Sequence, residues 1–202
     1  ELKPDGETRL RELVAEIAPK LRHLAALYDD TPSLQDRTVT TGIARPELVK
    51  QFAAGGYIGR ASGRNFDARR DFAYAPYTEL SFEVPVLSEG DVNARVWIRI
   101  REIEQSLSLV TQILDRLPSG SIRAAVPDVH RAGEAAAIVE SFRGDNFLWL
   151  RVHGDGTVAR CHPRDPSWFQ WAIVEAAIEG NIIADFPLCN KSFNCAYSGV
   201  DL

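Results

Sequence analysis

One uninterrupted heptad pattern dominates the sequence between residues 91 and 117. Apolar side chains recur there at alternating four- and three-residue steps, at Val96, Ile100, Ile103, Leu107, Val110, Leu114 and Leu117. Such a row lies along one face of an α-helix, which at 1.5 Å per residue would be about 40 Å long. Asp91 is a suitable N-cap for it, and Pro118 and Gly120 mark its end.

A second apolar row on the same stretch widens the apolar face of this helix. It consists of Trp97, Ile98 and Leu109. A wide face is typical of the central helix of a bundle and argues against a free coiled-coil dimer. We therefore expect the heptad row to be core, with Leu107 buried at its middle.

Two further helices are expected before this one. Apolar residues from Leu10 to Tyr28 recur at helical spacing, and Pro19 within them should bend or split the helix. Residues 46–52 begin with Pro46, which is favoured as a first helical residue, and are followed by Gly55 and Gly56. A helical part of the chain is thus predicted over residues 1–120.

The pattern then changes to short strand-like runs at residues 137–141, 147–152 and 157–161, joined by glycine-containing turns. These runs predict a three-stranded antiparallel meander within residues 136–163. Residues 166–179 predict another helix, which Gly180 ends, and residues 182–202 are expected to form an irregular tail containing Pro187.

No linker or internal repeat interrupts the sequence. With 202 residues, of which 45% are hydrophobic, the chain is long enough for one substantial core. We therefore expect a single domain over residues 1–202 of the α+β class, mainly α. It would be a helical bundle around one long helix with a small antiparallel meander.

Charge and composition exclude several function classes. The net charge is −5, and the basic residues are scattered among acidic ones, which argues against a nucleic-acid partner. The apolar runs are too short for a membrane span.

Three cysteines at irregular spacing predict reduced thiols in the cytoplasm. The sequence has no Met, so we expect a piece of a longer protein, or a sequence from which modified methionines are missing.

Common catalytic motifs do not identify a reaction for this sequence. The sequence contains no phosphate-binding glycine loop, no serine nucleophile elbow and no His-Glu-x-x-His. Cys161 and His162 are adjacent on a predicted strand and so point to opposite faces, which argues against their binding one metal ion together. Cys189 and Cys195 have the spacing of neither a zinc nor a redox pair, and small buried side chains are the better interpretation.

Two long strings carry more information. The first runs from Arg60-Ala61-Ser62-Gly63 through Asp67-Ala68-Arg69 to Gly90-Asp91, Arg95, Arg99, Glu102 and Ser106. The second runs from Val139-Glu140-Ser141-Phe142-Arg143-Gly144-Asp145 through Arg164-Asp165-Pro166 and Gly180-Asn181 to Asp201. In order and spacing, from about residue 37 onward, they resemble the large subunit of membrane-bound, energy-converting nickel-iron hydrogenases. They also resemble the related quinone-site subunit of respiratory complex I.

The resemblance has consequences for a metal site. In those hydrogenases two Cys-x-x-Cys pairs supply four thiolates to nickel and iron. By the family's spacing the terminal pair falls here at Ala196 and Gly199, which are not ligands, and Asn194 replaces the usual Asp. The resemblance therefore implies no metal and no cofactor bound by this chain, and instead the complex I condition, in which the cavity holds a quinone. Its expected lining is Arg143, Asn194, Cys195, Tyr197 and Asp201.

Three groups of charged residues have two interpretations each. The resemblance places the loop with Arg60, Ser62, Asp67 and Arg69 against a small iron-sulfur subunit; a solvated polar loop is the compatible alternative. The resemblance implies that Arg143 lies over the cavity, whereas spacing alone favours a surface turn residue paired with Asp145 or Glu140. The third group is Asp91, Arg95 and Arg99, which form either a charged path for protons or an N-cap followed by two exposed basic residues.

The leading functional expectation is the C-terminal part of an oxidoreductase large subunit that passes electrons from iron-sulfur centres to a quinone-like acceptor. Its partners would be the small iron-sulfur subunit and membrane subunits of the same complex. It would sit on the cytoplasmic, inner side of the cell membrane through those partners. The alternatives are a non-catalytic docking subunit and, more weakly, an active nickel-iron hydrogenase subunit.

Overall fold

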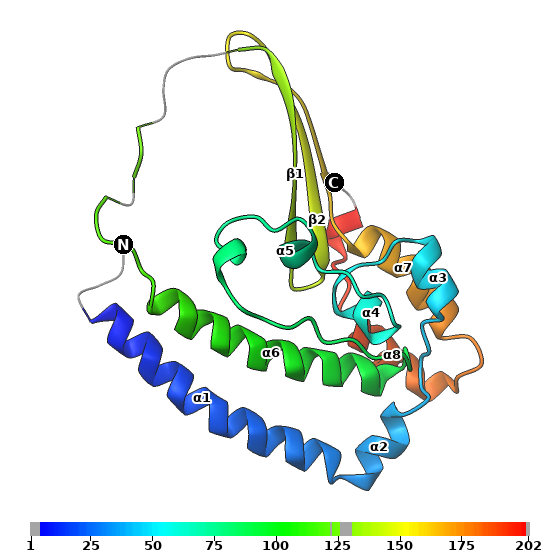
Figure 1. Ribbon diagram of the computed structural model, residues 1–202. Helices are drawn as coiled ribbons and strands as arrows, with labels where there is room; N and C mark the ends of the chain where they lie inside the picture. The colour runs from blue at the N-terminus through cyan, green and yellow to red at the C-terminus, as the bar shows by residue number, and fades with distance from the viewer. Residues whose placement is uncertain (1–4, 122, 126–130, 201–202) are drawn as a thin grey trace.

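Two long helices lie side by side along one side of the protein. The computed structural model describes residues 5–121, 123–125 and 131–200. Helices α1 (Gly6–Asp29) and α6 (Val92–Leu114) run antiparallel (Figure 1). Arg11 pairs with Asp115 at one end of the two helices, and Tyr28 donates a hydrogen bond to Asn93 at the other. Pro19 lies inside α1 without splitting it.

Helix α6 confirms the predicted long helix but buries a different face. The Asp91 carboxylate accepts the backbone N–H of Ala94 at 2.7 Å, as expected for an N-cap. The heptad row was predicted to be core, yet Ile103 is 43% exposed and Leu107 is only half-buried. Helix α1 runs along one side of α6, and the extended segment at residues 81–83 lies along another, where Gln112 and Gln105 accept the N–H groups of Ser81 and Glu83. The second row is the more deeply buried, with Ile98 fully buried and Leu109 5% exposed, although Leu114 of the heptad row is also buried.

Four short helices lie between the two long ones in the sequence. They are α2 (Pro32–Thr38), α3 (Pro46–Gln51), α4 (Gly56–Ala61) and α5 (Ala68–Asp71). Helix α3 begins at Pro46, as predicted, and every residue of α4 is buried. The core joins residues of α4 and α6 to residues near the C-terminus, including Tyr57, Ile98 and Phe193.

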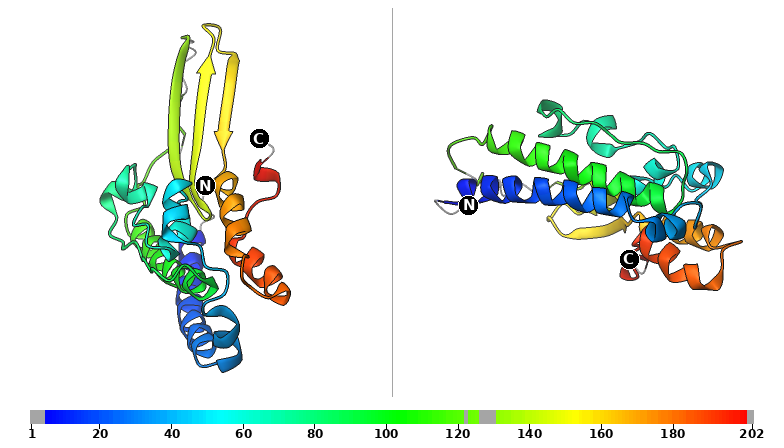
Figure 2. Two further views of the ribbon diagram at one scale, coloured as in Figure 1. Left: turned by 90° about the vertical axis from the view of Figure 1, so that its right-hand side faces the viewer. Right: turned by 90° about the horizontal axis from the view of Figure 1, so that it is seen from below.

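The predicted meander is confirmed. Strands β1 (Gly133–Ser141), β2 (Gly144–Val152) and β3 (Val158–Arg164) form one antiparallel sheet in the order β1-β2-β3. The strands are longer than predicted. Only the end with the β1–β2 turn packs against the helices, where Gly144 meets Gly55 and Gly56, and the remainder of the sheet projects away (Figure 2).

The expectation of an irregular tail after residue 182 is wrong. The predicted helix is present as α7 (Ser167–Ala177), but a further helix, α8 (Phe186–Phe193), follows it. Pro187 lies in the first turn of α8, where proline is tolerated because the first N–H groups have no helical partner. Asn194 ends α8 in the left-handed conformation, with φ of 50°.

Candidate functional site

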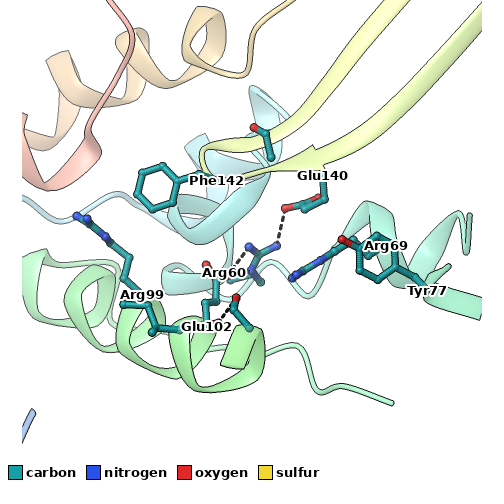
Figure 3. Close-up of a pocket in the computed structure, with 10 residues that line it drawn as sticks. Arg60, Arg69, Tyr77, Arg99, Glu102, Glu140 and Phe142 are labelled. Atoms are coloured by element: carbon teal, nitrogen blue, oxygen red, sulfur yellow. Dashed lines mark hydrogen bonds and ion pairs between the residues drawn. The ribbon is translucent and has the colours of Figure 1, made fainter. Parts of the chain in front are cut away.

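Arg60 lies at the centre of a buried group of charges. It is 1% exposed, although it sits on a helix of only six residues. Its Nε donates to Oε1 of Glu102 on α6 at 2.8 Å, and Nη2 donates to the same oxygen. Its Nη1 donates to Oε1 of Glu140 on β1 at 3.0 Å. Figure 3 shows Arg60 between these two carboxylates, so one guanidinium joins α4, α6 and β1.

A second arginine completes this group. Asp67 is fully buried and lies 3.2 Å from Nη1 of Arg60. Both of its oxygens also accept hydrogen bonds from the guanidinium of Arg69, at 2.9 and 2.6 Å. We call these five residues, Arg60, Asp67, Arg69, Glu102 and Glu140, the Arg60 cluster.

Burial and charge act on the pKa values of the cluster in opposite directions. Burial raises the pKa of Glu102 and of Glu140 above the usual glutamate range, although Arg60 opposes this shift for both. Burial lowers the pKa of Arg60, but the neighbouring carboxylates, first among them Glu102, raise it to a net value above its usual one. The arginines are therefore permanently charged, and the pKa values of Glu102 and Glu140 are both shifted upward.

A cavity of about 280 Å³ adjoins the Arg60 cluster. Its lining includes Arg60, Arg69, Glu102 and Glu140 of the cluster, together with Tyr77, Arg99, Ile103, Ser106, Ser141 and Phe142. The guanidinium of Arg99 lies over the rings of Tyr57 and Phe142, at 5.6 and 5.1 Å from their centroids. The cavity combines aromatic and charged walls, and its exposed lining residues, such as Phe142, connect it with solvent.

The interpretation of residues 60–69 as a solvated polar loop is wrong for most of its predicted residues. Arg60, Ser62 and Asp67 are buried, and Arg69 is largely covered. Ser62 lies apart from the cluster, next to Gly90. A contact between this loop and a small iron-sulfur subunit stays a prediction.

Arg95 is also buried, not exposed as the spacing suggested. Its guanidinium donates to the backbone carbonyls of Gly90 and Gly42 and to the hydroxyl of Ser192, and it lies 4.3 Å from the Phe193 ring centroid. Burial lowers its pKa to about 10. These acceptors are neutral, so Arg95 connects α6 to α8 and to the loop at residue 42 rather than continuing a chain of carboxylates.

Arg143 and the tail meet beside α7 and the end of α8. Arg143 Nε donates to the backbone carbonyl of Asn194 at 2.5 Å, and Gln170 donates to the carbonyl of Arg143 at 2.7 Å. Cys195 is buried, with its sulfur 3.9 Å from Oε1 of Gln170. The structure therefore brings together Arg143, Asn194 and Cys195, and the turn arginine bonds to the tail rather than to Asp145 or Glu140.

The other predicted tail residues are placed differently. Tyr197 is 71% exposed and packs on Trp171, with ring centroids 5.2 Å apart. Asp201 lies outside the described residues. At the family's two ligand positions, Ala196 donates its N–H to the hydroxyl of Ser167, and Gly199 packs against the carboxylate of Asp165. At both positions it is therefore the backbone, and not a thiol, that contacts the neighbouring residue.

Sequence reasoning assigned no site role to Glu102 and named Glu140 only as a possible partner of Arg143. One signal for Glu102 was present, because it follows Ile98 by four residues and precedes Leu109 by seven. These three positions share the buried face of α6, so a carboxylate there needs a buried partner. No comparable local signal exists for Glu140, whose partners are 72 to 80 residues away along the chain.

Comparisons with known proteins agree with this architecture. A family profile described as the 49 Kd subunit of respiratory-chain NADH dehydrogenase matches residues 1–132 and 129–202. In the archaeal respiratory membrane complex that is a membrane-bound sulfane sulfur reductase, one chain superposes with a TM-score of 0.92 at 29% identity. That match covers 98% of this chain and 56% of the other.

Two curated relatives are a hydrogenase and a subunit of an NADH-quinone oxidoreductase. The carbon monoxide-induced hydrogenase of Rhodospirillum rubrum is 30% identical over 195 residues, covering 96% of this chain and 54% of the relative. An NADH-quinone oxidoreductase subunit from Syntrophobacter fumaroxidans is 33% identical over 188 residues, covering 90% of this chain and 50% of the relative. The chain thus spans about half the length of the curated relatives it matches.

The fold and these likenesses define a class, the large-subunit fold shared by complex I-type and hydrogenase-type oxidoreductases. The chain belongs to the family of the 49 kDa subunit of respiratory-chain NADH dehydrogenase. This confirms the family and the mainly helical fold class that the sequence predicted.

Proposed function

We propose that this chain is the C-terminal part of a subunit in a membrane-associated respiratory or hydrogenase-type oxidoreductase complex. In this role the subunit helps to pass electrons from iron-sulfur centres to a quinone-like acceptor. The observation that carries the proposal is the tail of the family fold, where Arg143 donates to the backbone carbonyl of Asn194, the residue before Cys195, while the ligand positions hold Ala196 and Gly199. A charged donor is kept there, and the metal-binding thiols are not.

The residues present do not fit a nickel-iron centre. Such a centre needs thiolates, and neither ligand position of the tail supplies one. Burial raises the pKa of the Cys195 thiol to about 12, so its sulfur stays protonated at neutral pH. Cys189 lies elsewhere, against Gly42. We therefore propose that this chain binds no metal or other cofactor of its own and that the site receives a quinone head group as substrate.

The proposed partners are the small iron-sulfur subunit and membrane subunits of the same complex, and nucleic acid is not among them. Among the described residues, no helix is both long and apolar enough to cross a membrane. The relatives include a chain of a respiratory membrane complex. We propose peripheral attachment on the cytoplasmic side through the partner subunits.

Titration of the full-length complex with a short-chain quinone tests the proposal. We expect saturable binding that weakens at least tenfold when Arg143 is changed to Ala. Arg151→Ala is the matched control, because Arg151 lies on the same sheet but pairs with Glu134 in solvent. Equal affinities for the two variants, or no saturable binding to the wild-type complex, would contradict the assignment.

A docking subunit without a redox step is the second candidate. It is favoured by the hydrogen bond between Arg143 and Asn194, since a donor already used in the fold is less available to a substrate. This candidate predicts that the complex assembles but binds no quinone. Nickel analysis of the intact protein tests the weaker alternative of an active hydrogenase, which requires nickel in a ratio near one to the protein.

A further inference from the structure

The Arg60 cluster contains more acidic than basic groups. Three carboxylates, of Asp67, Glu102 and Glu140, surround the guanidinium groups of Arg60 and Arg69. With all five groups ionised, the buried cluster would carry an uncompensated negative charge. Such a charge is costly to keep away from water, and binding one proton removes it.

Hydrogen bonds identify the oxygen on which that proton fits. Both oxygens of Asp67 accept from arginine side chains, and in Glu140 Oε1 accepts from Arg60 while Oε2 accepts the N–H of Ala68 at 2.9 Å. In Glu102 both bonds from Arg60 reach Oε1. Within the described residues Oε2 of Glu102 accepts no hydrogen bond, so it is the carboxyl oxygen of the cluster left to carry a hydrogen.

The cavity beside the cluster gives this oxygen a route to solvent. Glu102 is one of its lining residues, next to the hydroxyl-bearing Ser106 and Ser141. A space of about 280 Å³ holds several water molecules, since one occupies roughly 30 Å³ in the liquid. Protons therefore have a path between Glu102 and bulk water along polar groups.

We propose that Glu102 is the proton-binding group of the Arg60 cluster and that it exchanges a proton on Oε2 with water in the cavity. Release gives the carboxylate and a hydronium ion, and the cluster gains one negative charge. Uptake reverses this step. The inference goes beyond the proposed electron transfer and does not depend on it, since it rests on the contacts of this cluster.

The groups that face Glu102 come from every element packed around it. Arg60 comes from α4, Asp67 and Arg69 from the segment that forms α5, and Glu140 from β1. Tyr77 and Arg99 line the same cavity. Arg99 points toward the ring of Phe142 in Figure 3, so Arg60 is the cation that contacts Glu102 directly.

Infrared spectroscopy of the full-length protein as a function of pH tests the proposal. A protonated carboxyl group has a carbonyl band separate from those of carboxylates, and the band shifts in D₂O. We expect the wild-type protein to show one such band that persists above the pH range in which exposed glutamates ionise and disappears on further addition of base. A folded wild-type protein in which no carboxyl band persists above that range would overturn the proposal.

Three variants assign the band. Glu102→Gln keeps an oxygen for Arg60 and should abolish the band. Glu140→Gln equalises the charges of the cluster, so the band should titrate about one pH unit lower or more. Glu104→Gln, on the exposed side of α6, should change nothing. A band that survives in Glu102→Gln overturns the assignment, as does an unshifted titration in Glu140→Gln, which gives a readout even if Glu102→Gln does not fold.

Discussion

Arg143 and Asn194 are joined by a hydrogen bond of 2.5 Å between the guanidinium Nε and the backbone carbonyl, across 51 residues of sequence. This bond ties the β1–β2 turn to the end of α8. Because Gln170 of α7 also donates to the carbonyl of Arg143, the turn is fixed to both C-terminal helices. The position of the projecting sheet therefore depends on a few polar contacts at its base.

The close approach of Gly56 to this turn predicts a strong effect of substitution. Gly56 has φ of +62°, and a Cβ there would overlap the backbone carbonyl of Arg143. Gly56→Ala should lower the free energy of unfolding by more than about 2 kcal/mol, from both backbone strain and the clash. Gly63→Ala should cost only about 1 kcal/mol, because φ is also positive there but nothing lies within 4 Å. Urea unfolding compares the two, and equal losses would contradict the predicted clash.

The two rows of α6 should differ in energetic weight. Leu109→Ala should lower the free energy of unfolding by about 2 to 5 kcal/mol, because Leu109 is buried and its loss leaves a cavity. Leu107→Ala should cost less, about 1 to 2 kcal/mol, since that side chain is only partly buried. Chemical denaturation of both variants measures the difference. A larger loss for Leu107 would show that the heptad row is the core after all.

The three cysteines should react at different rates. Cys161 is exposed, whereas Cys189 and Cys195 are buried, and none of the three forms a disulfide. Burial raises the pKa of both buried thiols, which reduces the reactive thiolate at neutral pH. A thiol reagent should modify one group rapidly in the native protein and three after unfolding without reductant. Rapid native labelling of Cys195 would contradict its placement in the core.

The stability of the protein should depend on pH through Glu102. Burial raises its pKa in the folded protein above that of the unfolded chain, so the native state binds more protons between the two values. The free energy of unfolding therefore decreases as pH rises from about 4.3, the ordinary glutamate value, through the raised one. Glu102→Gln should make this dependence shallower, with the contribution of Glu140 remaining. Unfolding curves at several pH values provide the slopes, and identical slopes in both proteins would refute the prediction.

The sequence by itself determined the local elements of this protein. The helical period around Ile98, the N-cap Asp91 and Pro46 depend on neighbours within one or two turns, so α6 and α3 were predictable. The glycine-containing turns likewise determined the meander. The family was recognisable because its residues recur in order from about residue 37 onward, which does not require knowledge of contacts.

Tertiary structure alone decided which charged residues are buried and which apolar ones are not. Arg60 lies 42 residues from Glu102 and 80 from Glu140, so no local pattern reveals that they share hydrogen bonds. The exposure of Ile103 depends on which helices pack on each side of α6, which periodicity does not specify. Burial is a property of the assembled fold, because it is set by neighbours that are distant in sequence. In this protein the fold buries Arg60 and Asp67 beside Glu102 and Glu140, and so forms the cluster that contains the proposed proton-binding carboxyl group.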